Sequence, residues 1–280
     1  MLAARAVDGL AAELGSTPAV ERTLADLADR ACLQVLVEDV RLVVKVDTDL
    51  ERSRREVAAL GAARRAGVRV PRVVWHREGI PAVLALEHLD GVPLGESAGG
   101  WRAAGAAARL LHGMPAGVGW RRFDHRAESW RQFLLWWTDH EAARCAEMGA
   151  LGSAEAAQMR HALRSRIEEM DEPRRTVLHG DLQPEHVLCL PGKQEVALLD
   201  WGDAGTGDPL WDLAVLLLDH RHRLPAVLAG YRPDQSTQAH IAEQLDTYRL
   251  LRYLGEITWL LARGFDAGAS IAGARAVLAG

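Results

Sequence analysis

The chain has 280 residues, of which 49% are hydrophobic, and a formal net charge of −5 at pH 7. This length exceeds the usual size of a single core, so we expect two lobes around a cleft. The negative charge disfavours a nucleic-acid partner, because such proteins concentrate positive charge against phosphates. It is weakly favourable to a cationic substrate.

Neither a membrane segment nor a disulfide framework is expected. No apolar run approaches the roughly 18 residues of a membrane span, and Arg5 and Asp8 lie where a signal peptide would have its apolar centre. The cysteines Cys32, Cys145 and Cys189 are widely spaced and form no metal-type pair. We therefore expect a cytoplasmic protein with no membrane partner, whose cysteines are small core residues.

The N-terminal residues predict helical turns followed by a β-hairpin. Residues 1–27 have Ala and Leu at helical spacing, whereas residues 35–46 alternate or run apolar, as strands do. A turn at Glu38 and Asp39 would join the two arms. The second arm contains Lys45, one of only two lysines in the chain. A compact ammonium can point at phosphates from a strand where a forked guanidinium fits poorly; the alternative is a solvent-facing lysine on an edge strand.

A helix is expected directly after the hairpin. Thr48 and Glu51 have the spacing of a capping box, so the helix would begin at Thr48 or the next residue. The helical pattern continues to Ala66, and Gly67 ends it. Glu56 lies near the apolar stripe of this helix, which indicates an inward position.

Two more strands and a series of helices complete the pattern. The strands are predicted at residues 73–76 and 82–87, joined by a turn that contains Gly79. Apolar residues then recur at helical spacing in five segments, at residues 103–114, 127–148, 153–170, 209–218 and 237–263. A cluster of four aromatic residues and one leucine in the second segment favours core packing over a ligand-binding box. Its members are Trp130, Phe133, Leu134, Trp136 and Trp137.

Two short apolar runs each lead to a carboxylate, Asp181 after the first and Asp200 after the second. Transfer of a γ-phosphoryl group needs one carboxylate that orients the attacking hydroxyl and accepts its proton. It also needs separate oxygen ligands that hold Mg²⁺ on the nucleotide phosphates. Asp181 suits the first role and Asp200 the second. His186, five residues after Asp181, returns toward the metal side.

These residues belong to an ordered set of motifs. The chain reads His179-Gly180-Asp181, His186, Leu199-Asp200-Trp201, Gly207-Asp208-Pro209 and Asp212-Leu213-Ala214. In order and spacing this set resembles the aminoglycoside phosphotransferase family, the small-molecule branch of the protein-kinase-like fold. The resemblance implies an α+β bilobal fold. Residues 1–90 would form a small nucleotide-binding lobe with an antiparallel sheet and one main helix. Residues 91–280 would form a larger, mostly helical lobe with the catalytic loop, metal site and acceptor pocket.

The resemblance also implies roles for single residues. Asp181 would be the catalytic base, and Asp200 a metal ligand. Lys45 would contact the α and β phosphates and pair with a glutamate of the following helix. Glu56 is our candidate for that partner, although Glu51 competes with it and Glu56 would otherwise be an exposed partner of a nearby arginine.

Further roles concern the backbone and the support of the catalytic loop. The backbone of Glu87, His88 and Leu89 would be the hinge that binds the adenine edge. His179 and Asp212 would support the catalytic loop through packing and hydrogen bonds, since proton abstraction falls to the aspartate of that loop.

Asp208 directly precedes a proline at a predicted helix start. A carboxylate there caps exposed backbone N–H groups, which favours a structural role over a catalytic one.

Two features depart from the family pattern. His186 stands where the family has a metal-binding Asn, and imidazole is a poorer ligand for Mg²⁺ than an oxygen. His186 would therefore contact phosphate, bind a softer divalent ion, or leave the protein with one metal. The first hairpin, at residues 28–37, has no glycine where a phosphate-covering loop usually has one. Its side chains, such as Gln34, would then approach the phosphates.

The leading prediction is a kinase that uses ATP or GTP, with Mg²⁺ or Mn²⁺, to phosphorylate a hydroxyl of a small, polar, cationic molecule. An antibiotic, either an aminoglycoside or a basic peptide antibiotic, is the favoured acceptor, and its inactivation would confer antibiotic resistance. A sugar or amino alcohol is the nearest alternative. The sequence does not indicate an oligomeric state.

Two other classes stay open. One is a degenerate kinase that binds a ligand without turnover, which the two departures motivate. The other is a metal-dependent phosphohydrolase that would use His179, Asp181, His186 and Asp200 as a binuclear cluster.

Overall fold

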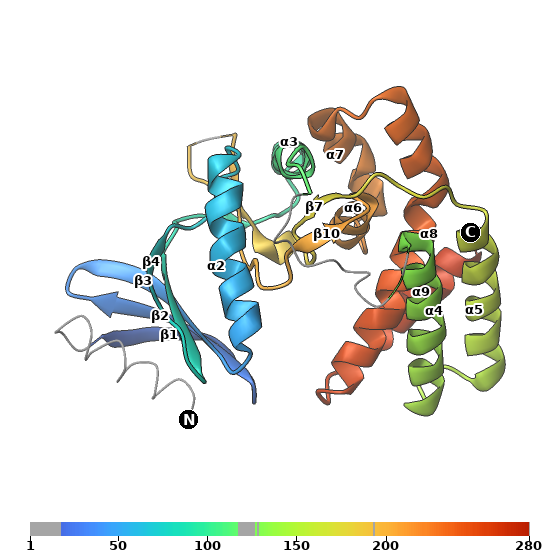
Figure 1. The fold of residues 1–280 in the computed structure, drawn as a ribbon, viewed down its shortest axis with the longest axis horizontal. Helices are drawn as coiled ribbons and strands as arrows, with labels where there is room; N and C mark the ends of the chain where they lie inside the picture. Colours follow the sequence, from blue (N-terminus) through green and yellow to red (C-terminus); the bar gives the residue numbers. More distant parts are fainter. Residues whose placement is uncertain (1–17, 117–126, 128, 193, 280) are drawn as a thin grey trace.

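The computed structural model describes residues 18–116, 127, 129–192 and 194–279. A sheet forms the N-terminal lobe and helices form most of the C-terminal lobe (Figure 1). The N-terminal sheet is antiparallel, in the order β1-β2-β3-β5-β4. Its strands are β1 (Ala19–Asp26), β2 (Arg30–Val37), β3 (Val40–Asp47), β4 (Val73–Arg77) and β5 (Ala82–Glu87). The predicted α+β fold class is confirmed, whereas a boundary at residue 90 stays a prediction.

Strand β1 contradicts the prediction of helical turns over residues 1–27; residues 1–17 lie outside the described residues. Val20 and Leu24 have the spacing of one helix face, yet both are largely exposed on the strand. The edge of β2 offers backbone hydrogen-bonding groups to this segment. Pairing with that edge outweighs the weak local preference of the segment for a helix. Glu21 also links β1 to β2 and β3, because its side chain accepts hydrogen bonds from Gln34 and Arg41, both at 2.9 Å.

The hairpin of β2 and β3 turns at Glu38 and Asp39, as predicted. Residues of β2 alternate between buried and half-buried positions, the pattern of a strand with one covered face. The buried face contributes Leu33 and Val35 to a small apolar core. The opposite face carries Lys45, and the functional site lies on that side.

Helix α2 (Leu50–Arg65) packs against β3, β4 and β5. Asp49 caps it by accepting a hydrogen bond from the Arg52 amide at 3.0 Å. The predicted capping box is therefore wrong: the Thr48 hydroxyl instead donates to the Asp29 carbonyl. The helix ends before Gly67, whose φ of 85° suits glycine.

The C-terminal lobe is built from seven helices in the described part of the chain. They are α3 (Ala98–His112), α4 (Trp130–Glu147), α5 (Ser153–Glu168), α6 (Leu210–Leu216), α7 (Leu224–Tyr231), α8 (Gln235–Leu261) and α9 (Gly268–Ala279). Helices α7 and α9 were not predicted. Helix α7 crosses α3 where Gly105 meets Gly230, and a Cβ on either residue would collide with a carbonyl of the other helix. None of the described helices is long and apolar enough to cross a membrane.

The core of this lobe confirms most of the aromatic prediction. Trp130, Phe133 and Leu134 are buried, and the rings of Trp130 and Phe133 pack with Trp211 of α6. Trp136 differs, because 41% of it is exposed. Of the three cysteines Cys145 is buried in the core, and Cys189 is half-buried and packs against the core. Cys32 is half-buried and belongs to neither apolar core, so the prediction is wrong for Cys32.

Short strands between the lobes carry the motif loops. Strand β7 (Thr176–Leu178) pairs with β10 (Gly205–Gly207). Strand β8 (Val187–Cys189) pairs with β9 (Val196–Leu198) and with β6 (Val92–Pro93). The Asp181 loop leaves β7 and the Asp200 loop leaves β9, so both carboxylates emerge at the junction of the lobes.

Candidate active site

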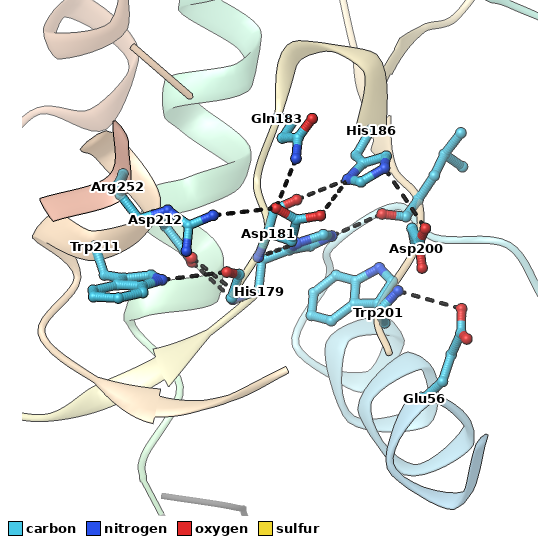
Figure 2. Close-up of polar contacts among 12 residues, drawn as sticks. Glu56, His179, Asp181, Gln183, His186, Asp200, Trp201, Trp211, Asp212 and Arg252 are labelled. Atoms are coloured by element: carbon cyan, nitrogen blue, oxygen red, sulfur yellow. Dashed lines mark hydrogen bonds and ion pairs between the residues drawn. The ribbon is translucent and has the colours of Figure 1, made fainter. Parts of the chain in front are cut away.

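Asp212 holds the catalytic loop from behind. Its carboxylate accepts hydrogen bonds from the amides of His179, at 2.7 Å, and Gly180, at 2.9 Å (Figure 2). His112 of α3 donates to the same carboxylate at 3.1 Å. Asp212 is completely buried, so these bonds replace the water that a carboxylate would otherwise require. The start of α6 thereby fixes the backbone immediately before Asp181.

His179 joins the two motif loops. Its Nε2 lies 2.8 Å from the Leu199 carbonyl, which can only accept, so Nε2 carries the proton. The other ring nitrogen accepts from the Asp181 amide at 3.4 Å. Burial lowers the pKa of His179, which keeps the ring neutral. A neutral ring with this tautomer ties the Asp181 loop to the residue before Asp200.

The Asp181 carboxylate faces the cleft and is a quarter exposed. Gln183 donates a hydrogen bond from Nε2 to its Oδ1 at 2.9 Å. Arg252 of α8 places Nη2 3.7 Å from the same oxygen, and its guanidinium lies over the ring of Trp211 at 5.0 Å. Gln183 and Arg252 thus lie beside one carboxylate oxygen, and His186 Nδ1 lies 3.6 Å from the other.

Lys45 bridges the two lobes. Its Nζ lies 2.5 Å from Glu56 Oε1 and 2.7 Å from Asp200 Oδ1. Burial alone would lower the pKa of Lys45, but the two carboxylates outweigh it and raise that pKa. The charge of Lys45 in turn holds the pKa of Asp200 below its ordinary value. Glu56, and not Glu51, is thus the helix glutamate beside the lysine; Glu51 pairs with Arg54 on the surface.

Helix α2 also forms hydrogen bonds to the loop that follows Asp200. Glu56 accepts from the Trp201 amide at 3.3 Å, and Arg55 donates to the Gly202 carbonyl at 2.8 Å. Asp200 itself has a φ of 60°, an uncommon conformation for a residue with a side chain. Arg55 was missed by sequence reasoning, although its place next to Glu56 on one helix offered a signal.

His186 has a defined orientation beside both carboxylates. Its Nδ1 donates to the Asp181 backbone carbonyl at 2.8 Å, so in the neutral ring Nε2 carries a lone pair. That nitrogen lies 3.6 Å from Asp200 Oδ2. An imidazole lone pair facing a carboxylate suits a divalent cation, but within the described ranges no three His, Cys, Asp or Glu side chains form a metal cluster. Asp200 and His186 would thus hold a cation whose other ligands are phosphate and water oxygens. Both ring nitrogens of His179 are hydrogen-bonded within the two loops, so His179 does not join them as a ligand of the predicted binuclear cluster.

The predicted hinge lies at the end of β5. The Glu87 amide donates to the Arg72 carbonyl at 2.9 Å, and the Glu87 side chain accepts from the Arg72 amide at 3.1 Å. Glu87 is thus engaged in joining β5 to the segment before β4. Adenine recognition by the backbone of His88 and Leu89 stays a prediction.

Asp208 lies just before the N-cap of α6, and its Oδ1 accepts from the Leu210 amide at 2.9 Å, which confirms the predicted structural role at the helix start. Its other oxygen accepts from the Tyr248 hydroxyl at 2.6 Å and pairs with His240 at 3.0 Å. These two partners come from α8 and were not predicted. Asp208 is fully buried, so it links α8 to the structure that carries the catalytic loop.

The first hairpin and α8 enclose a cavity of about 490 Å³ that contains Lys45 and Asp200. Arg30 and the turn before β2 form one wall, whereas Gln34 is held by Glu21 and does not line it. Trp259 and Phe265 form the opposite wall, and sequence reasoning did not select either. The cavity size is typical of sites for small molecules.

The fold and this site define a kinase-like phosphotransferase. A model of the phosphotransferase enzyme family matches residues 22–256. The chain belongs to this family and is a small-molecule kinase. No curated protein matches the chain.

Solved structures of several kinases share the fold. A thermostable mutant of aminoglycoside phosphotransferase APH(4)-Ia has 19% identity and a TM-score of 0.76 over 98% of each chain. A choline/ethanolamine kinase family protein from Mesorhizobium loti has 22% identity and a TM-score of 0.68, covering 100% of this chain and 94% of its own. A putative fructosamine-3-kinase from Haemophilus somnus 129PT has 15% identity and a TM-score of 0.66, over 98% and 95%.

Proposed function

We propose that this protein transfers the γ-phosphoryl group of ATP or GTP to a hydroxyl of a small, polar, cationic molecule. One observation carries the proposal: Lys45 lies between Glu56 and Asp200, and His186 lies 3.6 Å from the carboxylates of both Asp181 and Asp200. Relatives of the same fold have been crystallised with ADP or AMP-PNP, which supports a nucleotide co-substrate. The intact set of charged groups favours an enzyme over a kinase-like protein without turnover.

In the proposed reaction Asp181 orients the acceptor hydroxyl and takes its proton as the oxygen attacks the γ-phosphorus. The bond from the γ-phosphorus to the bridging oxygen breaks, and the nucleoside diphosphate leaves. Lys45 binds phosphate oxygens, and Asp200 with His186 would hold a divalent cation. Such a cation, when bound, neutralises charge on the phosphates. Gln183 keeps the accepting carboxylate in place.

The favoured acceptor is an antibiotic. The APH(4)-Ia structure in complex with ADP and hygromycin B supports an aminoglycoside, and a basic peptide antibiotic shares its cationic, hydroxylated chemistry. The fructosamine and choline kinase relatives keep a sugar or an amino alcohol as the second candidate.

A turnover assay tests the proposal. ATP and GTP would each be supplied with Mg²⁺ or Mn²⁺ and with aminoglycosides, basic peptide antibiotics, simple sugars and choline. Acceptor-dependent release of nucleoside diphosphate is the expected result. Intact nucleotide binding without turnover for any acceptor would instead support the non-enzymatic reading.

His186→Asn should change which metal the nucleotide complex prefers. The proposed imidazole ligand favours Mn²⁺ over the harder Mg²⁺, and an amide oxygen should reverse this preference. The measurement is the affinity of Mn²⁺ and Mg²⁺ for the AMP-PNP complex, by electron paramagnetic resonance competition. His140→Asn, at an exposed position on α4, is the control. Equal metal preference in wild type and His186→Asn would remove His186 from the metal site.

A further inference from the structure

Arg252 of α8 is a cation beside the candidate base, and its hydrogen-bond donors are unused. Only 17% of its side chain is exposed, and Nη2 approaches Asp181 from the side opposite His186 (Figure 2). Nε is buried without a hydrogen-bond partner. Within the described part of the chain the guanidinium has an ion pair with Asp181 and a ring contact with Trp211, but no hydrogen bond. Unpaired donors in a largely buried place cost free energy, so their presence at a functional site indicates a ligand that satisfies them.

Trp211 holds the guanidinium in this position. The ring centroid lies 5.0 Å from the central carbon of the guanidinium, and Trp211 Nε1 donates to the Gly180 carbonyl at 3.3 Å. Trp211 is completely buried, next to the Asp212 that accepts from the amides of the catalytic loop. Arg252 is therefore fixed relative to that loop, and a cation fixed in advance needs little rearrangement to act on a reacting group.

The charge of Arg252 is only partly neutralised. Asp181 is its one ion-pair partner in the described ranges, and the separation of 3.7 Å is longer than a hydrogen bond. Glu256, one turn later on α8, forms no ion pair with it in those ranges and accepts a hydrogen bond from Ser270 at 2.9 Å. Gln183 already donates to the Asp181 oxygen that faces Arg252. Positive charge thus stays available to a further anion beside the base.

The phosphoryl group in transfer is the anion that the proposed reaction brings to this place. Its phosphorus lies between the leaving oxygen and the acceptor oxygen. The acceptor oxygen must lie about 2.6–3.2 Å from the Asp181 carboxylate to give up its proton. The other phosphoryl oxygens then come within reach of Arg252. Because the group moves toward Asp181 as it leaves the nucleotide, this contact is stronger in the transition state than in the ground state.

We propose that Arg252 is a second catalytic residue, which donates hydrogen bonds from its terminal nitrogens to the oxygens of the transferring phosphoryl group. This inference rests on the proposed function and adds a residue to it. The acceptor oxygen bonds to the γ-phosphorus, the bond to the bridging oxygen of the nucleoside diphosphate breaks, and the acceptor proton passes to Asp181. The guanidinium exchanges no proton; it stabilises negative charge on the phosphoryl oxygens during this exchange.

Binding of a transition-state analogue tests the inference. ADP with Mg²⁺ and aluminium fluoride imitates the phosphoryl group in transfer, whereas AMP-PNP imitates the ground state; the guanine forms are measured as well. The proteins are wild type, Arg252→Met, Arg252→Lys and Arg221→Met. Methionine can still pack on Trp211 but has no donor, and lysine keeps the charge without the planar fork. Arg221→Met is the matched control, because Arg221 pairs with Asp246 at a similar distance, 3.5 Å, on the surface. Calorimetry gives the affinities, and transfer assays give kcat and the acceptor KM.

Arg252→Met should bind the aluminium fluoride complex about tenfold or more weakly than wild type, and AMP-PNP equally well. Its kcat should fall by about 10²- to 10³-fold, the usual loss when a charge-stabilising donor is removed, with the acceptor KM unchanged. Arg252→Lys should lie between wild type and Arg252→Met in both measurements. Arg221→Met should match wild type.

Equal affinity of wild type and Arg252→Met for the aluminium fluoride complex would overturn the inference even if kcat fell, because Arg252 would then act only through Asp181. A raised acceptor KM at an unchanged kcat would also overturn it, since Arg252 would then bind the acceptor. In both cases turnover by wild type would leave the proposed kinase activity intact. Wild type that neither bound a nucleotide nor transferred phosphate would overturn both proposals.

Discussion

Asp181→Asn should lower the rate of phosphoryl transfer by about 10²- to 10⁴-fold, the usual contribution of a positioned general base. The amide keeps the size of the side chain and one acceptor oxygen for the hydrogen bond from Gln183, but it cannot accept the hydroxyl proton. Nucleotide affinity should be unchanged, because Lys45 and Asp200 are untouched. The measurements are single-turnover transfer rates and titration with a fluorescent nucleotide.

Asp139→Asn is the control for this substitution. Asp139 forms a partly exposed ion pair with Arg164 at 2.8 Å on the helical lobe. Exposed ion pairs contribute little to folding stability, so neither the phosphoryl-transfer rate nor the free energy of unfolding should change appreciably. If Asp181→Asn turned over at a rate near that of wild type, Asp181 would not be the base.

Asp212→Ala should have the largest effect on stability, about 3–5 kcal/mol in the free energy of unfolding. The substitution leaves the buried amides of His179 and Gly180 and the ring of His112 without their acceptor. Asp212→Asn should lower the free energy of unfolding by less, because the amide retains one acceptor oxygen. Denaturant unfolding measures both, and unfolding midpoints equal to wild type would refute the role of Asp212.

The effect of Asp212 should depend on pH. Burial alone would raise the pKa of Asp212, but the hydrogen bonds from the His112 ring and the His179 backbone amide outweigh burial and lower it below the ordinary value of 3.8. A lowered pKa in the folded state contributes stability above the unfolded pKa and loses it as the pH falls through the folded pKa. The stability difference between wild type and Asp212→Asn should be constant above about pH 5 and shrink below about pH 4.

The motif residues were predictable because they are close together in the sequence, so two short strands and the loop between them determine where they lie. A strand, a tight loop and a second strand bring Asp181, His186 and Asp200 together whatever the rest of the chain does. Lys45 and Glu56 were predictable through the family resemblance, since they are distant from the loops in sequence. The structure brings these side chains together, and their chemical roles stay predictions.

Features that depend on tertiary contacts escaped prediction. Strand β1 has a helix-like spacing of apolar residues, and only the edge of β2 makes it a strand. Helix α7 is short, with glycine near its end, and becomes stable by packing against α3. Arg252 and Trp259 lie within the regular pattern of α8, so nothing local separates them from other helix residues. Arg252 is notable because it lies beside Asp181, and Trp259 because it lines the cavity that contains Lys45 and Asp200.

Phosphorus-31 NMR of the acceptor tests the central claim most directly. Wild-type protein would be incubated with ATP or GTP, a divalent cation and each member of the acceptor panel, hygromycin B first, beside a matched sample of Asp181→Asn. We predict a new phosphomonoester resonance, coupled to a proton on the carbon that bore the acceptor hydroxyl, that grows with wild type and is absent with the variant. Inorganic phosphate as the sole new product, formed equally by both proteins across the acceptor panel, would contradict the account.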